Sequence, residues 1–330
     1  MKALRRRTMM KTSSLRTLCL AAALGTVPAL HAQEAFPARA VTIVVPYSAG
    51  GVTDYFARQI GNKLSRMWGQ PVVVDNRAGG GTIIGTQMVG KAPADGYTLL
   101  FTSYGFTANQ VLRKNLPYAK TALRPVVLLG SSHNVLLVNN RLKGKPLTAI
   151  IADAKAAPGS LKLASSGLAS SPHIGAEFFA KKVGITFTHV PYKGQGPSMS
   201  DLIAGVVDGM FDGMSSYAQV KGGRVAAVAI AAPTRHPAAP EIPTFKELGV
   251  DLVTGTWFGM LAPAATPDAV VGRINADIRL ALQDEELKAQ VSKTGLSVST
   301  STPEAFGQFL QEESDKLQSL VDQGVQIEMD

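Results

Sequence analysis

A loop of small residues follows the first strongly apolar run of the chain and leads directly into a helical pattern. The run is Val41-Thr42-Ile43-Val44-Val45, and Gly50 and Gly51 lie in the loop that ends at Asp54. Glycine lets a backbone approach a ligand closely, and the first amide N–H groups of a helix have no partner within it. Because a carboxylate or a phosphate can accept hydrogen bonds from such groups, this loop predicts an anion site.

Small polar residues or glycines also follow other predicted strands. They are Gly79-Gly80-Gly81, Ser103, Ser165-Ser166-Gly167 and Gly194-Gln195-Gly196. Any one of these segments can be an ordinary tight turn. Ligands of α/β proteins, however, bind at the carboxyl ends of strands, so the recurrence of such loops favours a binding site.

The motifs of common enzyme and cofactor sites are not matched. The serines near position 165 do not form a Gly-x-Ser-x-Gly elbow. Residues 80–85 resemble half of a phosphate-binding P-loop, but Thr86 and Gln87 stand where Lys and Ser/Thr are required, and Ile84 replaces the third glycine of a dinucleotide site. The histidines lack the paired spacing of metal ligands. We therefore expect no catalytic residue, no cofactor and no metal.

Residues 1–32 have the composition of a secretory signal peptide. Six basic residues precede the apolar run Leu18 to Leu30, and Leu30-His31-Ala32 suits signal cleavage. The run is shorter than the ~20 residues of a membrane-spanning helix, which makes a retained anchor the weaker interpretation. Cleavage would remove Cys19, the only cysteine, and with it any disulfide or thiolate chemistry.

The charge of the mature chain argues against nucleic acid as a partner. The formal net charge is +9, but six of the 33 Lys and Arg residues lie within positions 1–32, so the mature charge is +3. No Lys/Arg-rich run remains and aromatic residues are few, which leaves no phosphate-neutralising stripe or stacking platform. The expected partner is a small solute or a protein.

The size and the order of the apolar runs predict an α/β protein with two lobes. The chain without residues 1–32 is near the length at which one hydrophobic core divides. Short apolar runs without alternation, typical of parallel strands buried on both faces, take turns with helical patterns. We predict strands at 41–45, 72–74, 98–102, 126–129, 135–138, 161–164, 186–190, 209–211 and 225–231, and helices at 52–64, 82–91, 147–157, 173–183 and 198–204.

Two further helices are predicted near the C-terminus. Thr266-Pro267-Asp268 and Thr302-Pro303-Glu304 each place a capping hydroxyl, a first-turn proline and an acid ahead of a helical pattern. Apolar residues at helical spacing follow both starts, and we interpret them as core packing.

Five short motifs follow one another along the chain. They are Val44-Val45-Pro46-x-x-x-Gly50-Gly51-x-x-Asp54, Asp75-Asn76-Arg77-x-Gly79-Gly80-Gly81, Ala94-Asp95-Gly96-Tyr97-Thr98-Leu99, His189-Val190-Pro191-Tyr192-Lys193-Gly194 and Val207-Asp208-Gly209-Met210-Phe211. In this order they resemble the solute-binding proteins of tripartite tricarboxylate transporters, often called the Bug family. The resemblance runs from about Phe36 to the C-terminus.

The resemblance implies a periplasmic, monomeric two-lobed binding protein of the type II (Venus-flytrap) class, with a mixed, mostly parallel sheet flanked by helices in each lobe. Lobe 1 would contain residues 33–132 and 255–330, and lobe 2 residues 133–254. Such a protein is an extracytoplasmic solute receptor and not an enzyme. It closes over a small carboxylate, which is a di- or tricarboxylate, an aromatic acid or an amino acid, and serves a tripartite tricarboxylate-type membrane transporter or a sensor kinase.

The resemblance also implies which residues hold the ligand, because family members grip a carboxylate with backbone amides and waters from the loops after the first strand of each lobe. Carried onto this sequence, the lobe 1 set is Tyr47, Ala49, Gly50, Gly51, Thr53, Asp54 and Ser103. The lobe 2 set is Ser165, Ser166, Gly167, Ser171, His173 and Asp212. Ala176 stands where many members have glycine, which leaves the size of the ligand open.

Three questions stay open at this stage. Asp54 suits the first turn of a helix for structural reasons, which we favour, whereas family members that bind amino acids use acidic groups for the ammonium. A periplasmic enzyme acting on a small carboxylate would instead use Asp54, His173 or Asp212 as proton carriers in the same cleft, and would need a nucleophile and a base close together. An interaction module without a solute would have a cleft filled by side chains.

Overall fold

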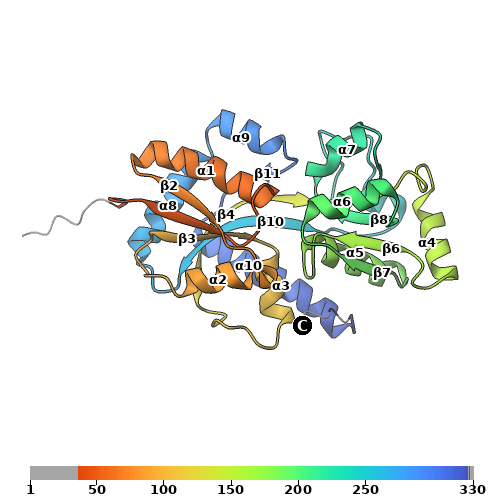
Figure 1. Cartoon of the computed structure of the whole chain (residues 1–330), viewed down its shortest axis with the longest axis horizontal. Helices are drawn as coiled ribbons and strands as arrows, with labels where there is room; N and C mark the ends of the chain where they lie inside the picture. The colour runs from red at the N-terminus through yellow and green to blue at the C-terminus, as the bar shows by residue number, and fades with distance from the viewer. Residues whose placement is uncertain (1–35, 326, 328–330) are drawn as a thin grey trace, which may run out of the picture. The chain divides into compact units, whose positions relative to one another are not determined.

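The computed structural model describes residues 36–325 and 327, and the unit that begins at Phe36 is compact by itself. The predicted signal peptide lies outside the described residues. Figure 1 shows the helices of this unit gathered around two β-sheets. No helix in the described part of the chain combines the length and the apolar composition needed to cross a membrane.

The first sheet contains the strand that leads into the glycine loop. Its strands, in spatial order, are β11 (Ser297–Val298), β4 (Leu123–His133), β10 (Gly255–Pro263), β3 (Thr98–Ser103), β1 (Val41–Val45) and β2 (Val72–Asn76). β1 is parallel to β2 and β3, whereas β10 is antiparallel to both β3 and β4, and β11 is antiparallel to β4. β1, β2, β3 and β4 therefore run in one direction, so their carboxyl ends share one edge of the sheet.

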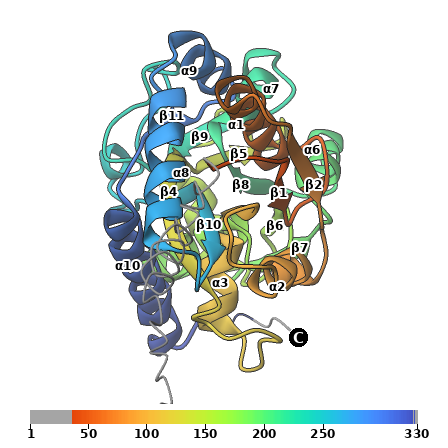
Figure 2. The same ribbon diagram turned by 90° about the vertical axis from the view of Figure 1, so that its left-hand side faces the viewer.

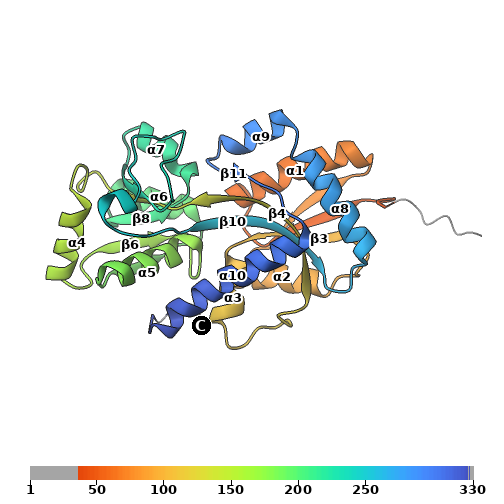
Figure 3. The same cartoon turned by 180° about the vertical axis from the view of Figure 1, so that it is seen from behind.

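Alternating residues of the strands bury this sheet on both faces. Val41, Ile43 and Val45 of β1 pack with α1 (Val52–Trp68), α8 (Asp268–Ala281) and α9 (Glu285–Ser292), whereas Val44 packs in a second cluster with α2 (Ile83–Gly90), α3 (Gly105–Leu112) and α10 (Pro303–Asp322). Figure 2 shows α1 and α2 on opposite sides of β1, and Figure 3 shows α10 running beneath β10. The period of two residues explains why the run from Val41 to Val45 carries apolar side chains on both faces of the strand.

The second sheet has the same kind of construction. Its order is β7 (Thr188–Pro191), β6 (Lys162–Ser165), β8 (Gly209–Asp212), β5 (Val135–Val138) and β9 (Ala226–Ile230). β6 is parallel to β7 and β8, and β5 lies antiparallel between β8 and β9. One buried cluster joins this sheet to α4 (Leu147–Ala156) and α5 (Ser171–Val183), and another joins it to α6 (Gln195–Ala204). α7 (Tyr217–Lys221) follows β8.

The chain passes between the sheets on two adjacent segments. Asn134 is the single residue between β4 and β5, and Thr254 immediately precedes β10. The amide N–H of Asn134 donates to the carbonyl of Thr254 at 2.9 Å, next to the paired residues His133 and Gly255. Both crossings therefore lie directly beside ordered strands, and the predicted lobe boundaries at 132/133 and 254/255 remain a prediction.

The predicted helix starts near the C-terminus had different outcomes. Thr302 caps α10, because its side-chain oxygen accepts from the amide N–H of Ala305 at 3.2 Å. The predicted cap at Thr266 is wrong. α8 begins at Asp268 after Pro267, so Thr266 lies one residue too early, and its buried hydroxyl has no hydrogen-bond partner among the described residues.

Candidate ligand site

The loop between β1 and α1 leaves several amide groups open. Gly51 is the N-cap of α1 in an extended conformation, and no side chain caps this helix. The first helical hydrogen bond runs from the amide N–H of Tyr55 to the carbonyl of Gly51. The amides of Val52, Thr53 and Asp54 consequently have no helical acceptor, and Ala49 to Gly51 in front of them are exposed. The start of α1 can receive an anion.

Asp54 holds this loop in shape. Its Oδ2 accepts the amide N–H of Gly50 at 2.9 Å and the Nε of Arg58 at 3.1 Å, and its Oδ1 lies 2.9 Å from Nη2 of Arg58 in an ion pair. Burial raises the pKa of Asp54, but hydrogen bonds from Arg58, Gly50 and Asn76 outweigh this and keep its pKa below the usual value. These contacts support the structural role of Asp54, and they also occupy the amide of Gly50.

The carboxyl ends of β2 and β3 support the same loop. The Nδ2 of Asn76 donates to the carbonyl of Tyr47 at 3.1 Å, and the Tyr47 hydroxyl lies 2.7 Å from Oγ of Ser103. A Cβ on Gly105 would lie 3.1 Å from that hydroxyl, so the start of α3 approaches Tyr47 closely. The predicted lobe 1 residues Tyr47 and Ser103 are thus brought together.

The loop between β6 and α5 is organised by hydrogen bonds to its own backbone. The amide of Gly167 donates to Oγ of Ser165 at 3.2 Å, and Oγ of Ser170 donates to the carbonyl of Gly167 at 2.7 Å. No side chain caps α5, and its first backbone bond runs from Ile174 to Ser170. Within the described residues no acceptor faces the amides of Ser166, Leu168, Ser171 and His173. This loop therefore also presents free donors.

Two stacked histidines lie beneath the second loop. The rings of His173 and His189 are 3.7 Å apart and nearly parallel. Nδ1 of His173 accepts the amide N–H of Ala169 at 3.1 Å, and Nε2 of His189 lies 2.7 Å from Oγ of Ser165. Burial, with repulsion from His173, lowers the pKa of His189 to about 3. His189 is therefore neutral at ordinary pH, and the stacked pair supports the loop through the contacts of its ring nitrogens with Ala169 and Ser165.

Asp212 is buried at the end of β8 with its oxygens occupied. Oδ1 accepts the amide N–H of Gly213 at 2.8 Å, and Oδ2 accepts from the side chains of Gln195 and Ser216. Burial raises the pKa of Asp212 even though those groups hydrogen-bond its charged form. The contacts tie the start of α6 to β8, so the structure gives Asp212 a role inside the second sheet's loops.

One buried cluster connects the surroundings of the two loops. Ala169 and Ile174 belong to it from the second loop and α5, and Tyr104 and Phe106 belong to it from the segment that follows Ser103. Tyr104 is next to Ser103, which contacts Tyr47 of the first loop. The segments beside both loops thus share one apolar core.

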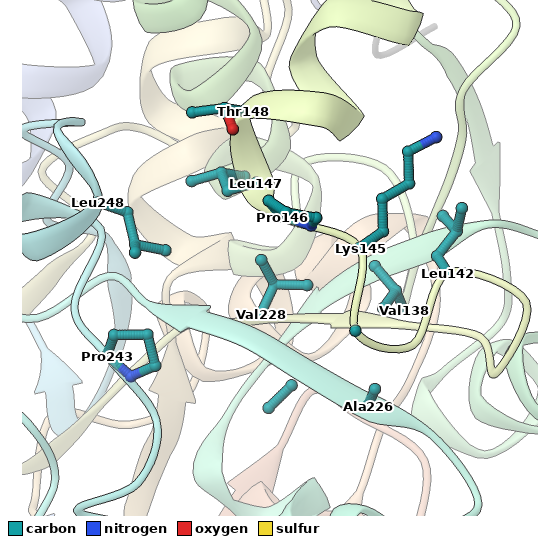
Figure 4. A pocket seen from close by; sticks show the side chains of 12 residues that line it. Val138, Leu142, Lys145, Pro146, Leu147, Thr148, Ala226, Val228, Pro243 and Leu248 are labelled. Carbon is teal, nitrogen blue, oxygen red and sulfur yellow. The ribbon is translucent and has the colours of Figure 1, made fainter.

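Two surface hollows of the described residues lie away from these loops. The larger, about 280 Å³, is lined mainly by apolar side chains around the start of α4 and the edge strand β9, including Leu147, Val228 and Leu248 (Figure 4). The smaller, about 170 Å³, lies between α1 and α9 around the Lys63–Asp284 ion pair. No group of three or more metal-binding side chains occurs among the described residues.

Sequence reasoning missed His189, Asn76 and Asn134 as residues that support the loops. His189 lies in a quoted motif, but as one of several scattered histidines it gave no sign of its partner. Pairing of β6 with β7 places Leu163 beside His189, so strand alternation puts Ser165 and His189 on one face. That inference requires knowing that β6 and β7 are neighbours.

Comparison with known proteins gives matches over most of the chain. Residues 56–325 match the model of the tripartite tricarboxylate transporter family receptor. A protein of the tcbD-tcbE intergenic region of Pseudomonas sp. strain P51 is 37% identical over 294 residues, which cover 87% of each chain.

Two solved structures from Rhodopseudomonas palustris are also similar. Rpa4515 with adipate is 30% identical with a TM-score of 0.82 and covers 87% of this chain and 97% of its own. MatC with bound malate is 30% identical with a TM-score of 0.80 and covers 87% of this chain and 100% of its own.

The fold predicted from the resemblance is confirmed. The structural matches include periplasmic binding proteins, and the two mixed sheets flanked by helices form the two-lobed α/β fold of that class. The chain therefore belongs to the tripartite tricarboxylate transporter receptor family.

Proposed function

We propose that this protein is a periplasmic receptor that binds one small carboxylate between its two sheets and delivers it to a membrane transporter. The observation that carries the proposal is the pair of uncapped helix starts, α1 and α5, each preceded by a loop at the carboxyl end of a strand. The relatives named for adipate and malate support a carboxylate as the ligand class. The ligand donors are the amides of Val52, Thr53, Ser171 and His173, with Gly51 and Ser166 beside them.

Backbone amides can supply the required affinity without an arginine. A hydrogen bond to a charged group contributes about 1.5–3 kcal/mol, and each helix start adds about 0.3–1 kcal/mol for an anion. Four such bonds together with both helix starts give about 7–14 kcal/mol, a range that includes the roughly 8 kcal/mol of micromolar binding before the cost of association and lobe closure is subtracted. Selectivity then arises from donors that the wrong solute leaves unpaired.

One contact resembles the nucleophile and base of a serine enzyme. Ser165 and His189 are close enough to be a nucleophile and a base. Ser165 is fully buried, however, and its hydroxyl is also within hydrogen-bonding distance of the carbonyl and the amide of Gly167. A histidine whose pKa is about 3 is a weak base near neutral pH. The contact fits support of the loop better than nucleophilic catalysis.

The proposal is tested by the ligand-dependent melting temperature of the mature protein. A panel of dicarboxylates, tricarboxylates, aromatic acids and amino acids is expected to contain at least one compound that raises it, because a ligand that binds only the folded state stabilises that state. Native mass spectrometry of protein purified without unfolding would identify a retained acid. The proposal fails if no member of the panel binds or stabilises the protein.

Delivery to a transporter needs a separate experiment. Membrane subunits of a tripartite tricarboxylate-type transporter, reconstituted in vesicles, are expected to accumulate the stabilising carboxylate only when the receptor is added. Receptor-independent uptake would contradict the transport role while leaving carboxylate binding intact.

A further inference from the structure

We infer that Asn134 is a positioning residue that couples the crossing between the sheets to the start of the ligand helix α5. The inference rests on the proposed function, because it assigns α5 to the ligand. Asn134 is the single residue between β4 and β5 and is 2% exposed. A polar side chain buried at this point must find its partners within the protein.

The side chain of Asn134 hydrogen-bonds both to the start of α5 and to the returning segment before β10. Its Nδ2 donates to the carbonyl of Ser171 at 3.2 Å and to Oγ1 of Thr254 at 3.3 Å, and its Oδ1 accepts from Oγ of Ser171 at 3.2 Å. Ser171 is the first residue of α5, and Thr254 lies on the returning segment. One amide group therefore fixes the carbonyl and the hydroxyl of Ser171, the residue whose N–H we assign to the ligand.

The backbone of Asn134 completes the junction. Its N–H donates to the carbonyl of Thr254 at 2.9 Å, its carbonyl accepts from the amide of Ala231 at 2.7 Å, and the amide of Thr254 donates to the carbonyl of Ala231 at 3.1 Å. Both crossing segments and the end of β9 are thus held at one residue. A rotation of one lobe against the other therefore changes the backbone at this junction. The side chain of Asn134 transmits this backbone change to the start of α5.

Close packing from α5 gives an independent observation. A Cβ added to Gly175 would lie 2.6 Å from Nδ2 of Asn134 and 3.3 Å from Oγ1 of Thr254. Gly175 is inside α5, where alanine is the better helix former. Only the absence of a side chain at Gly175 leaves room for the amide of Asn134.

Residues 33–330 contain no cysteine, so spin labels can be attached at introduced cysteines to measure the distance between the lobes. Spin labels at Asn62→Cys on α1 and Lys155→Cys on α4, both exposed, report the distance between the lobes. Asn134→Ala is expected to broaden this distance distribution without any ligand. It is also expected to weaken binding of malate or adipate, whichever the unsubstituted protein binds, by about tenfold. The reason is that the N–H of Ser171 is no longer held in place for the ligand.

Asn139 provides a matched control. It follows the other end of β5, is 1% exposed, and its Nδ2 donates to the carbonyl of Val207 at 2.7 Å. Asn139→Ala is expected to lower the melting temperature as much as Asn134→Ala but to leave the distance distribution and the affinity unchanged. Gly175→Ala is expected to reproduce the effects of Asn134→Ala, because the new methyl group displaces the same amide.

The outcomes separate this inference from the proposed function. If Asn134→Ala and Gly175→Ala leave the distance distribution like that of Asn139→Ala, the coupling role is wrong even when a carboxylate binds. If the distribution broadens but neither malate, adipate nor the wider carboxylate panel binds the unsubstituted protein, the junction is confirmed and the ligand assignment fails.

Discussion

The two candidate ligand loops reach the same result by different chemistry. The first loop, Tyr47 to Asp54, is shaped by the charged carboxylate of Asp54, which binds the amide of Gly50 and pairs with Arg58. The second loop, Ser165 to His173, is shaped by the stacked rings of His173 and His189, of which His189 is neutral, and by the hydroxyl of Ser165. In both loops the supporting groups use some amides and leave others at the helix start free.

The difference separates the amides that hold the shape of each loop from the amides that we propose as ligand donors. The amides of Gly50 and Gly167 are bonded within their loops, although glycines first draw attention in the sequence. The free amides belong to residues at the helix starts, such as Val52 and Ser171. A substitution at a free amide can therefore change ligand binding without changing the shape of the loop. A substitution at a supporting group changes the shape of the loop.

The largest expected effect is on binding by Val52→Pro. Proline suits the first helical position and removes the amide hydrogen there. Since a hydrogen bond to a charged group contributes about 1.5–3 kcal/mol, carboxylate affinity should fall about tenfold or more in calorimetric titration. Glu285→Pro, at the first position of α9, is the control and should not change the affinity. Equal affinities of both variants would remove Val52 from the site.

Glycine substitutions distinguish the shape of a loop from its contact with ligand. Gly50 (φ +85°) and Gly167 (φ +140°) have backbone conformations that strain any L residue, and a Cβ on Gly167 would also lie 3.3 Å from the carbonyl of Tyr192. Alanine at Gly50 should cost about 1–2 kcal/mol of unfolding free energy, and alanine at Gly167 should cost more. Urea denaturation measures both values, and the reverse order would contradict this account.

Gly51→Ala is the contrasting substitution in the first loop. Gly51 has φ −80° and the nearest atom to an added Cβ is 3.8 Å away, so stability should change by less than about 0.5 kcal/mol. The methyl group would nevertheless stand in front of the free amides and lower carboxylate affinity several-fold. Unchanged affinity would show that no ligand approaches Gly51.

Asp54→Asn tests the charged support of the first loop. Asparagine can still accept from Gly50 but loses the ion pair with Arg58, which we expect to cost about 1–2 kcal/mol in urea denaturation. Because the folded pKa of Asp54 is lowered, its stabilisation is present above the unfolded value near 3.8 and disappears as the pH falls through the lower folded value. If instead only amino acid binding is lost while stability is unchanged, Asp54 binds an ammonium group.

His189→Gln tests the neutral support of the second loop and should have the smallest effect at neutral pH. The folded pKa of about 3 lies below the usual 6.5, so the unfolded chain binds more protons between these values and the protein loses stability as the pH falls through that range. Glutamine does not titrate, so the melting temperature should depend less steeply on pH from about 6.5 to about 3. An unchanged slope would mean that His189 is not held neutral.

Much of the fold followed from local patterns. The strand at residues 135–138 has the predicted bounds, and the helix predicted at 147–157 ends one residue earlier in the structure. The run Gly255–Pro263 was not predicted as a strand, because two glycines and a terminal proline hide its pattern. It is nevertheless central to the first sheet, where pairing with β3 and β4 outweighs its weak propensity.

The site was less accessible to sequence than the fold. Glycines after the predicted strands pointed to the two candidate loops, because the backbone freedom that lets a loop approach a ligand depends on residue type. The partners of those loops could not be predicted, since His173 and His189 come from different elements and Asn134 bonds to residues 37 and 120 positions away. Which amides stay free depends on such long-range contacts, and these are settled only by the packing of the sheets.

The central claim is that both helix starts hold one carboxylate together. Heteronuclear NMR of the mature protein during titration with a carboxylate that raises its melting temperature tests this most directly. We predict that the amide signals of Val52, Thr53, Ser171 and His173 shift together, with one common dissociation constant. Signals that shift at only one of the two helix starts, or with different dissociation constants, would contradict a single ligand held by both.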